Sequence, residues 1–250
     1  MASDDENQQS PFAKPGFLIS AVIVVLVVVA GVFLGIMNAT RDEPESDAAT
    51  PAPSSATPTP TTEPADMPSG DSVCNLAGES LSGTLATAPE ATWEYQDTLA
   101  YPTSPEFGPA ETDLDSVRYC FQRSPEGALF AAANAAVQSS GPASGSWISY
   151  FLSEKTVGRQ ELLTDIAPST GTPPDMRLSI EGFKVLAYDG SSARIDLAAR
   201  IAASGETSYM STIYDLVWED GDWKLLPQNS SNPLRFAQIP DLAGYVPWRG

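Results

Sequence analysis

The sequence contains no histidine. This absence excludes Ser-His-Asp and Cys-His catalysis, zinc sites that use histidine, and pH switching by histidine. Only two cysteines are present, which is too few for a thiolate metal cluster, and no Walker loop, Rossmann glycine pattern or EF-hand loop occurs. We therefore expect no metal, no cofactor and no enzymatic activity.

Positive charge is also scarce, because 13 lysines and arginines face 32 acids and give a net charge of −19. The first 72 residues hold ten acids and two bases, which leaves 22 acids and 11 bases in the remainder. Both parts are acidic, so the basic surface that nucleic-acid binding requires is missing. We expect no direct nucleic-acid partner.

Long apolar runs are absent, with one exception at residues 16–37. This block has 22 residues and no charge. At about 1.5 Å per residue, a helix of this length spans roughly 33 Å, enough for a hydrocarbon core of about 30 Å. The block predicts an uncleaved transmembrane helix. The alternative is a cleaved signal peptide, whose apolar region is only about 7 to 15 residues long and ends at small residues. Met37-Asn38-Ala39 matches such an end poorly.

The segments that flank the span indicate its orientation. Lys14 and Arg41 balance each other, so positive charge alone does not decide it. The tail, residues 1–15, is short, whereas both cysteines follow the span. We expect this tail inside the cell and the C-terminal part outside, in a single-pass protein of the cell membrane. Within the span, Gly31 and Gly35 form a G-x-x-x-G pair that predicts self-association, although glycine is common in membrane helices.

Residues 38–72 differ in composition from both neighbours. Between Asp42 and Asp71 lie seven prolines and seven acids, with no lysine, arginine or aromatic residue. Such a segment cannot bury enough apolar surface to offset its ordering entropy, so we expect a disordered, extended stalk. The stalk would hold a folded domain, residues 73–250, away from the membrane.

The cysteines, Cys74 and Cys120, both lie in this outer domain. An even number of cysteines outside the cytoplasm predicts a disulfide, and closing this loop would stabilise the fold by about 4 kcal/mol at most in the chain-entropy model. The alternative is two buried, reduced thiols.

Helices are expected in the first half of the domain. Ser124-Pro125-Glu126 predicts a helix start, with a capping hydroxyl, proline at the first position and an acid near the positive end of the dipole. An alanine-rich run follows it. A second helical region covers about residues 146–166, with a break at Gly158 and an apolar stripe that begins at Trp147, Tyr150 and Phe151.

After Met176 the apolar period changes to two, which is typical of strands. Asp189-Gly190 and Asp220-Gly221 are tight-turn sequences, and a slip in the alternation near Gly182 predicts a bulge. We expect four strands at about residues 178–187, 193–201, 209–218 and 223–226. Helices followed by an antiparallel meander indicate an α+β fold.

The final hairpin, Trp218 to Leu226, has the spacing W-x-x-G-x-W-x-L, which resembles the last hairpin of nuclear-transport-factor-2-like (cystatin-like) domains. This resemblance covers roughly residues 124–227 and implies a cone of helices packed on a curved antiparallel sheet. The helix start Arg123 to Ala128, the span and the stalk resemble actinobacterial membrane proteins of a domain family without assigned function, some of them in conjugative elements. The layout is also similar to the bitopic assembly factors of type IV secretion and conjugation.

In a cone of this type, five aromatic residues are candidates for lining an apolar pocket, and the alternative is that they form the core. They are Trp147, Tyr150, Phe151, Tyr214 and Trp218. Related isomerases use Asp and Tyr residues, but none of Asp165, Asp196, Tyr209, Tyr214 and Asp215 maps onto their pattern. Asp196 is expected to point away from the apolar face and to pair with Arg194 or Arg200.

The C-terminal segment, residues 232–250, is rich in large apolar side chains and in proline, which forbids a long helix or a central strand. Either it folds back over the sheet or it docks a partner. The candidates for docking are Phe236, Ile239, Leu242, Tyr245 and Trp248.

Together these features favour a non-catalytic, membrane-anchored interaction domain with protein partners in the cell envelope, as in a conjugation or secretion assembly. The alternative is an envelope module that binds or senses a small apolar ligand.

Overall fold

The computed structural model describes residues 72–141, 143–165, 176–203, 205–229 and 232–249. The predicted cytoplasmic tail, the span with Gly31 and Gly35, and the stalk as far as Asp71 lie outside these residues. In the part of the chain that is described, no helix has the length and apolar character needed to cross a bilayer.

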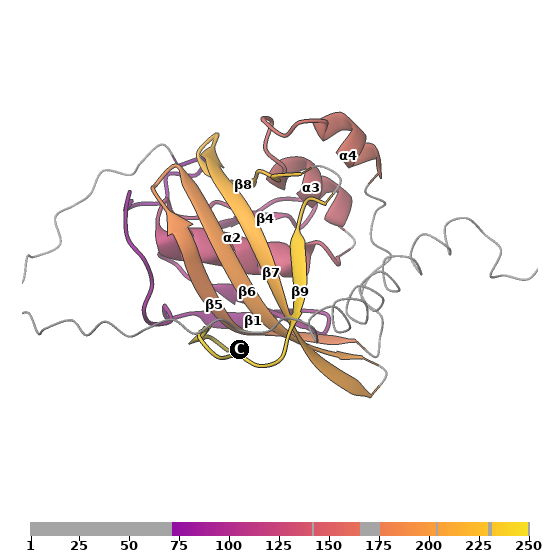
Figure 1. Ribbon diagram of the computed structural model, residues 1–250. Coiled ribbons are helices and arrows are strands. Elements are labelled where there is room, and N and C mark those ends of the chain that lie inside the picture. Colours follow the sequence, from indigo (N-terminus) through magenta and orange to yellow (C-terminus); the bar gives the residue numbers. More distant parts are fainter. Residues whose placement is uncertain (1–71, 142, 166–175, 204, 230–231, 250) are drawn as a thin grey trace, which may run out of the picture. The chain divides into compact units, whose positions relative to one another are not determined.

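An eight-stranded sheet dominates the domain (Figure 1). Its order is β1-β2-β5-β6-β7-β8, with β10 also on β5 and β9 also on β7. The three long central strands are β5 (Arg177–Tyr188), β6 (Ser192–Ala203) and β7 (Glu206–Glu219). The shorter strands are β1 (Thr92–Gln96), β2 (Leu99–Thr103), β8 (Asp222–Leu225), β9 (Arg235–Ile239) and β10 (Val246–Pro247).

The long strands are the predicted meander, and their alternation sets the two faces of the sheet. On β6, Ala193, Ile195 and Leu197 are buried in the core. The predicted bulge is confirmed, because the pairing of β5 with β6 shifts between Ile180 and Gly182. The four predicted strands pair antiparallel, as expected. The sheet also contains β2, which runs parallel to β5 at Leu99 and Leu178, so the whole sheet is mixed rather than antiparallel.

Helix α2 (Pro125–Gln138) lies across one face of the sheet (Figure 1). The Ser124 hydroxyl caps it by accepting a hydrogen bond from the Gly127 N–H at 3.0 Å. A Cβ at Gly127 would lie 1.9 Å from the carbonyl oxygen of Gln122, so this position requires glycine. Most of α2 is buried, because its alanines let the helix approach the strands closely.

The second helical region forms two helices, α3 (Ser144–Phe151) and α4 (Arg159–Asp165). Gly158 separates them with a positive φ of 70°, which agrees with the predicted break. Both helices lie beside the β8 end of the sheet (Figure 1). The fold is therefore α+β, as expected.

A small second sheet precedes α2, in which β3 (Glu111–Thr112) pairs with β4 (Arg118–Tyr119). Directly after β4, Cys120 forms the predicted disulfide with Cys74, and their Cα atoms are 6.1 Å apart. The disulfide ties the first described residues to the segment that leads into α2.

Candidate functional site

Three of the five aromatic residues predicted to line a pocket are buried in the core. Trp147 stacks on Phe151 with ring centroids 5.1 Å apart, and Tyr214 of β7 is buried in the same cluster. Tyr150 and Trp218 are partly buried and pack against this cluster. None of the five lines either of the two hollows described below.

Tyr150 belongs to a polar cluster around Asp222, a fully buried residue of β8. The Asp222 carboxylate accepts hydrogen bonds from the backbone N–H groups of Cys120 and Phe121, at 2.8 and 2.9 Å, and from the Tyr150 hydroxyl at 2.7 Å. The Lys224 ammonium lies 3.0 Å from the centre of the Tyr150 ring. These contacts supply the hydrogen bonds that a buried carboxylate needs, and they join the sheet to the residues that follow β4.

Burial changes the acid–base behaviour of this cluster. Desolvation raises the pKa of Asp222, although its hydrogen bonds and Lys224 oppose the change. Desolvation lowers the pKa of Lys224 to about 8, against the attraction of Asp222. It also raises the pKa of Tyr150, and Asp222 adds to that rise.

The expected partners of Asp196 are wrong. The residue lies on the sheet face opposite the core, yet it is buried, because the C-terminal segment covers it. Its carboxylate accepts hydrogen bonds from the hydroxyls of Ser211 at 2.6 Å and Tyr245 at 2.8 Å. Arg194 instead pairs with Asp215, at 2.6 Å, and Arg200 pairs with Glu181, at 3.2 Å.

Asp215 and Tyr209 lie on the same sheet face as Asp196, whereas Tyr214 faces the core. The side chain of Asp165 is outside the described part of the structure.

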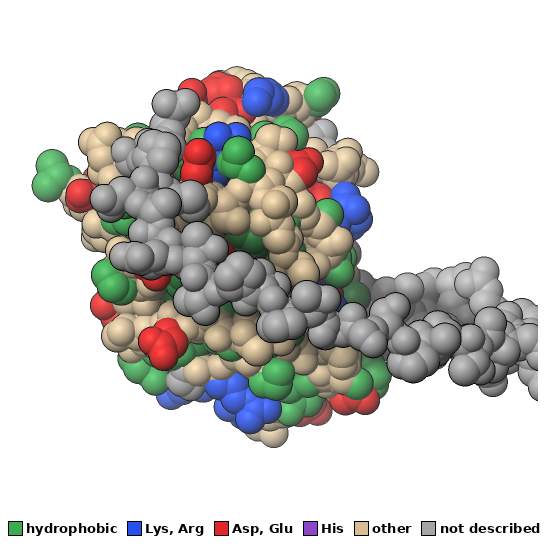
Figure 2. Space-filling model, turned by 90° about the vertical axis from the view of Figure 1, so that its left-hand side faces the viewer, with side chains coloured by type: hydrophobic (Ala, Val, Ile, Leu, Met, Phe, Trp, Pro, Cys, Tyr) green, Lys and Arg blue, Asp and Glu red, His purple; other side chains and the backbone are tan. Residues whose placement is uncertain are grey.

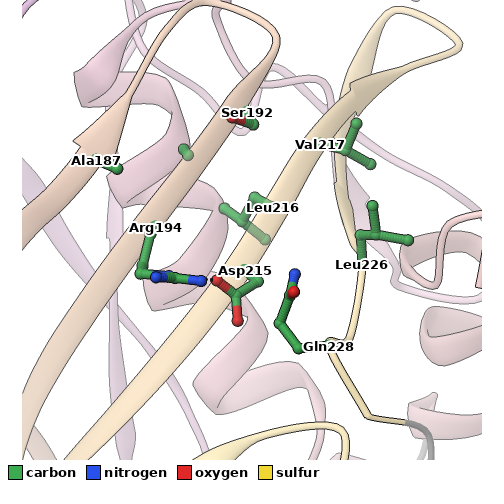
Figure 3. Close-up of a pocket in the computed structure, with 9 residues that line it drawn as sticks. Ala187, Ser192, Arg194, Asp215, Leu216, Val217, Leu226 and Gln228 are labelled. Atoms are coloured by element: carbon green, nitrogen blue, oxygen red, sulfur yellow. Dashed lines mark hydrogen bonds and ion pairs between the residues drawn. The ribbon is translucent and has the colours of Figure 1, made fainter.

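The first hollow, of about 300 Å³, opens on this face between β6, β7 and the chain after β8 (Figure 3). Arg194 and Asp215 form an ion pair at its edge, opposite Gln228. Asp215 also pairs with Arg235 at 2.8 Å, so its charge is matched by two arginines. The other lining residues are small or apolar: Ala187, Ser192, Ala193, Leu216, Val217 and Leu226.

The C-terminal segment folds back over the sheet. This is the first of the two alternatives that the sequence left open, the other being a docking site for a partner. After pairing with β7 as β9, it reaches β5 as β10, where the Val246 carbonyl lies so close to Gly182 that a Cβ there would be 2.8 Å away. Trp248 is buried, with edge-to-face contacts to Trp93, Phe130 and Phe183. The last described residues therefore lie near β1 and β5 (Figure 1).

The remaining docking candidates differ in exposure. Tyr245 is half-buried, and the Lys184 ammonium lies 3.8 Å from its ring centre. Desolvation raises the pKa of Tyr245 to about 12, and Asp196 adds to the rise. Ile239 and Leu242 are half-buried, whereas Phe236 of β9 is 55% exposed.

The second hollow, of about 410 Å³, lies between β2 and the small sheet of β3 and β4. Arg118 lines this hollow and is only 9% exposed. The guanidinium carbon of Arg118 stacks 3.8 Å from the centre of the Tyr101 ring, and the Tyr101 hydroxyl donates a hydrogen bond to Glu94 at 2.8 Å. The other lining residues are Thr103, Ser104, Pro105, Pro109, Ala110 and Thr112.

A buried polar network holds Arg118 from behind. Its Nε donates to Asn134 at 2.8 Å and its Nη1 to Gln96 at 3.0 Å. Gln138 accepts from the Arg118 backbone N–H at 2.7 Å and donates to its carbonyl at 3.1 Å. Nη2 is buried and has no hydrogen-bond partner.

Residues 49–247 match the model of a family described as a domain of unknown function, DUF8175. The chain belongs to this family. Comparisons with curated proteins and with solved structures found no match. All the helices and strands named above lie within the matched range, and Trp248 follows its last residue.

The charges of the DUF8175 domain at the second hollow suit recognition of a polar ligand. Desolvation lowers the pKa of Arg118, and it raises the pKa of Tyr101 together with the hydrogen bond to Glu94. An arginine side chain keeps its positive charge in proteins, and the raised pKa of Tyr101 favours the protonated hydroxyl that donates to Glu94. In the described residues, no group of three or more acids, cysteines or histidines is placed to hold a metal ion.

The aromatic and periodic patterns of the sequence did not point to this hollow. One signal was available: Asn134 and Gln138 are polar and lie four positions apart in an alanine-rich helix, so they share one helical face. A buried amide on such a face requires partners, which indicates a polar network beneath the helix.

Proposed function

We propose that the chain is a single-pass membrane protein whose DUF8175 domain lies outside the cytoplasm and acts by binding rather than by catalysis. The observation that carries this proposal is the Cys74–Cys120 disulfide. Disulfides persist in oxidising compartments and are rare in the cytosol. The disulfide lies at the start of the domain and follows a charge-free run of membrane-spanning length. This order supports export of the domain, with residues 16–37 held in the membrane.

The segment between the span and the domain supports an interaction role. Its proline content and its charge of one sign favour an extended chain, which would let the domain reach partners at a distance from the bilayer. The arrangement is similar to that of bitopic assembly factors of conjugation and type IV secretion. We therefore propose protein partners within a cell-envelope assembly of that kind. This likeness is one of layout, and it sets the direction of the first experiment.

The alternative, a module for a small apolar ligand, requires the aromatic set to surround a cavity. The burial of Trp147, Phe151 and Tyr214 in the core weighs against that alternative. Leu114 and Val157 are among the exposed large apolar side chains of the described residues. On the face shown in Figure 2, the apolar side chains lie among polar ones. A partner would therefore meet a mixed polar and apolar surface.

The test is a cross-linked pull-down of the tagged full-length protein from its native membrane, followed by mass spectrometry. The matched control is residues 1–72 alone, which keeps the tail, the span and the stalk. Enrichment of envelope-assembly proteins over this control is the expected result. Equal recovery from both baits would refute a partner-binding role for the domain.

A further inference from the structure

The hollow beside β4 contains a buried cation with an unused donor. Arg118 is only 9% exposed, and its Nη2 has no hydrogen-bond acceptor. No acid forms a salt bridge with Arg118 in the described part of the chain. A buried cation without an acid partner is costly, and because Arg118 also lines the hollow, an anion bound there would offset its charge.

A negative charge, that of Glu94, also lines this hollow. Tyr101 separates the two charges, because Arg118 stacks on its ring while its hydroxyl donates to Glu94. Glu94 is exposed, and a carboxylate has about four acceptor positions, so it can still receive an ammonium group. The hydroxyls of Thr103, Ser104 and Thr112 complete a polar lining.

We propose that this hollow binds a small zwitterion of the amino-acid type. The ligand carboxylate accepts from the Arg118 guanidinium, and the ligand ammonium donates to Glu94. A ligand with only negative charge fits less well, because Glu94 and the net charge of −19 repel it. The volume of about 410 Å³ lies in the usual range for small-molecule sites and leaves room for a side chain.

This proposal goes beyond an interaction role, and it depends neither on the membrane anchor nor on a protein partner. It can be tested on the full-length protein in detergent. All five tryptophans lie in the folded domain, so their fluorescence reports its unfolding. The probes are L-alanine and L-leucine, with the N-acetyl and amide forms of each as ligands that lack one charge.

The expected result is a saturable rise in Tm of about 2 to 4 °C with the free amino acids, because a ligand that binds only the folded state stabilises it. The N-acetyl and amide forms should give less than half of this rise. An equal rise with the N-acetyl form would contradict the role of Glu94 and indicate recognition of a peptide C-terminus instead.

Two pairs of variants locate the site without disturbing the bonds of Arg118. Ala110→Phe fills the hollow from an exposed position, and Ala237→Phe adds the same side chain on β9 as a control. Glu94→Gln removes the negative charge, and Glu111→Gln removes a nearby exposed charge outside the lining. Ala110→Phe and Glu94→Gln should abolish the Tm rise, whereas both controls should keep it.

The proposal would be overturned if neither amino acid gave a saturable rise. It would also fail if the rise survived Ala110→Phe, because the ligand would then bind elsewhere.

Discussion

At the scale of single residues, the carboxylate of Asp222 joins β8 to the residues around the disulfide. It accepts the backbone N–H groups of Cys120 and Phe121, and Cys120 has a positive φ of 68°. Few non-glycine residues adopt this backbone conformation, so it needs support from its surroundings. Asp222 provides that support from inside the domain, and the disulfide provides it from the other side.

We expect Asp222→Asn to lower the free energy of unfolding by about 2 to 4 kcal/mol, because one buried N–H group would face an amide NH₂ instead of an acceptor. Chemical denaturation measures the effect. The matched control is Asp220→Asn, an exposed turn residue with a positive φ of 53°, a conformation that asparagine tolerates. Equal stability of the two variants would show that the Asp222 contacts do not support the fold.

Lys224 predicts a pH dependence of stability. Its pKa is about 8 in the folded state, below the ordinary lysine value of 10.5, so between these values the unfolded state binds more protons. Stability must then rise with pH in this window. The free energy of unfolding of the wild type, relative to that of Lys224→Met, should increase by about 2 kcal/mol between pH 8 and pH 10. Denaturation curves at several pH values test this, and a constant difference between the two proteins would contradict it.

At the scale of elements, the start of α2 depends on close contact between backbones. Gly127→Ala should destabilise the domain by about 2 kcal/mol or more, because the added Cβ would overlap the Gln122 carbonyl. Gly145→Ala in α3 is the matched control. Its added Cβ meets nothing within 4 Å, so this change should stabilise the domain by up to about 1 kcal/mol. Thermal unfolding measures both variants, and destabilisation by Gly145→Ala would reject this explanation.

The C-terminal segment acts as a strap across the sheet, and Trp248 is the residue that anchors it. Trp248→Ala should lower the free energy of unfolding by about 3 to 5 kcal/mol, because it removes a ring in contact with three other aromatic rings. Phe236→Ala, on exposed β9, should cost less than about 1 kcal/mol. Similar losses for both variants in urea denaturation would show that the strap does not depend on Trp248.

The sequence predicted those helices, turns and bulges that depend on short, local residue patterns. The cap at Ser124, the break at Gly158 and the bulge near Gly182 are all present. Each depends on neighbouring residues, as does the alternation along β6 and β7. Contacts between distant segments could not be predicted in this way, and they include the parallel pairing of β2 with β5.

The candidate site was missed for the same reason. Its charges come from β1 and β4, short strands with little periodicity, and the polar network behind it comes from α2. The predicted partners of Asp196 were wrong because the C-terminal segment covers this residue. That segment is rich in proline and has no apolar periodicity from which its path could be predicted. Asn134 and Gln138, which share one face of the alanine-rich α2, are the residues from which a buried polar network could have been predicted.

At the scale of the whole molecule, a folded, disulfide-bonded domain follows an acidic spacer and a proposed membrane anchor. We propose that this domain lies outside the cytoplasm. Binding partners, and any ligand of the Arg118 hollow, would then be those available at the outer surface of the membrane.

The most direct measurement is the labelling of single added cysteines in intact cells with a membrane-impermeant maleimide, while the native disulfide remains in place. Leu114→Cys places the thiol at a fully exposed position of the domain, and Ser3→Cys places it in the tail proposed to be cytoplasmic. We predict that Leu114→Cys is labelled in intact cells, whereas Ser3→Cys is labelled only after lysis. Labelling of Ser3→Cys alone in intact cells would indicate the opposite topology, with the tail outside the cell and the domain inside. Protection of both sites until lysis would place the domain inside the cell and contradict the account.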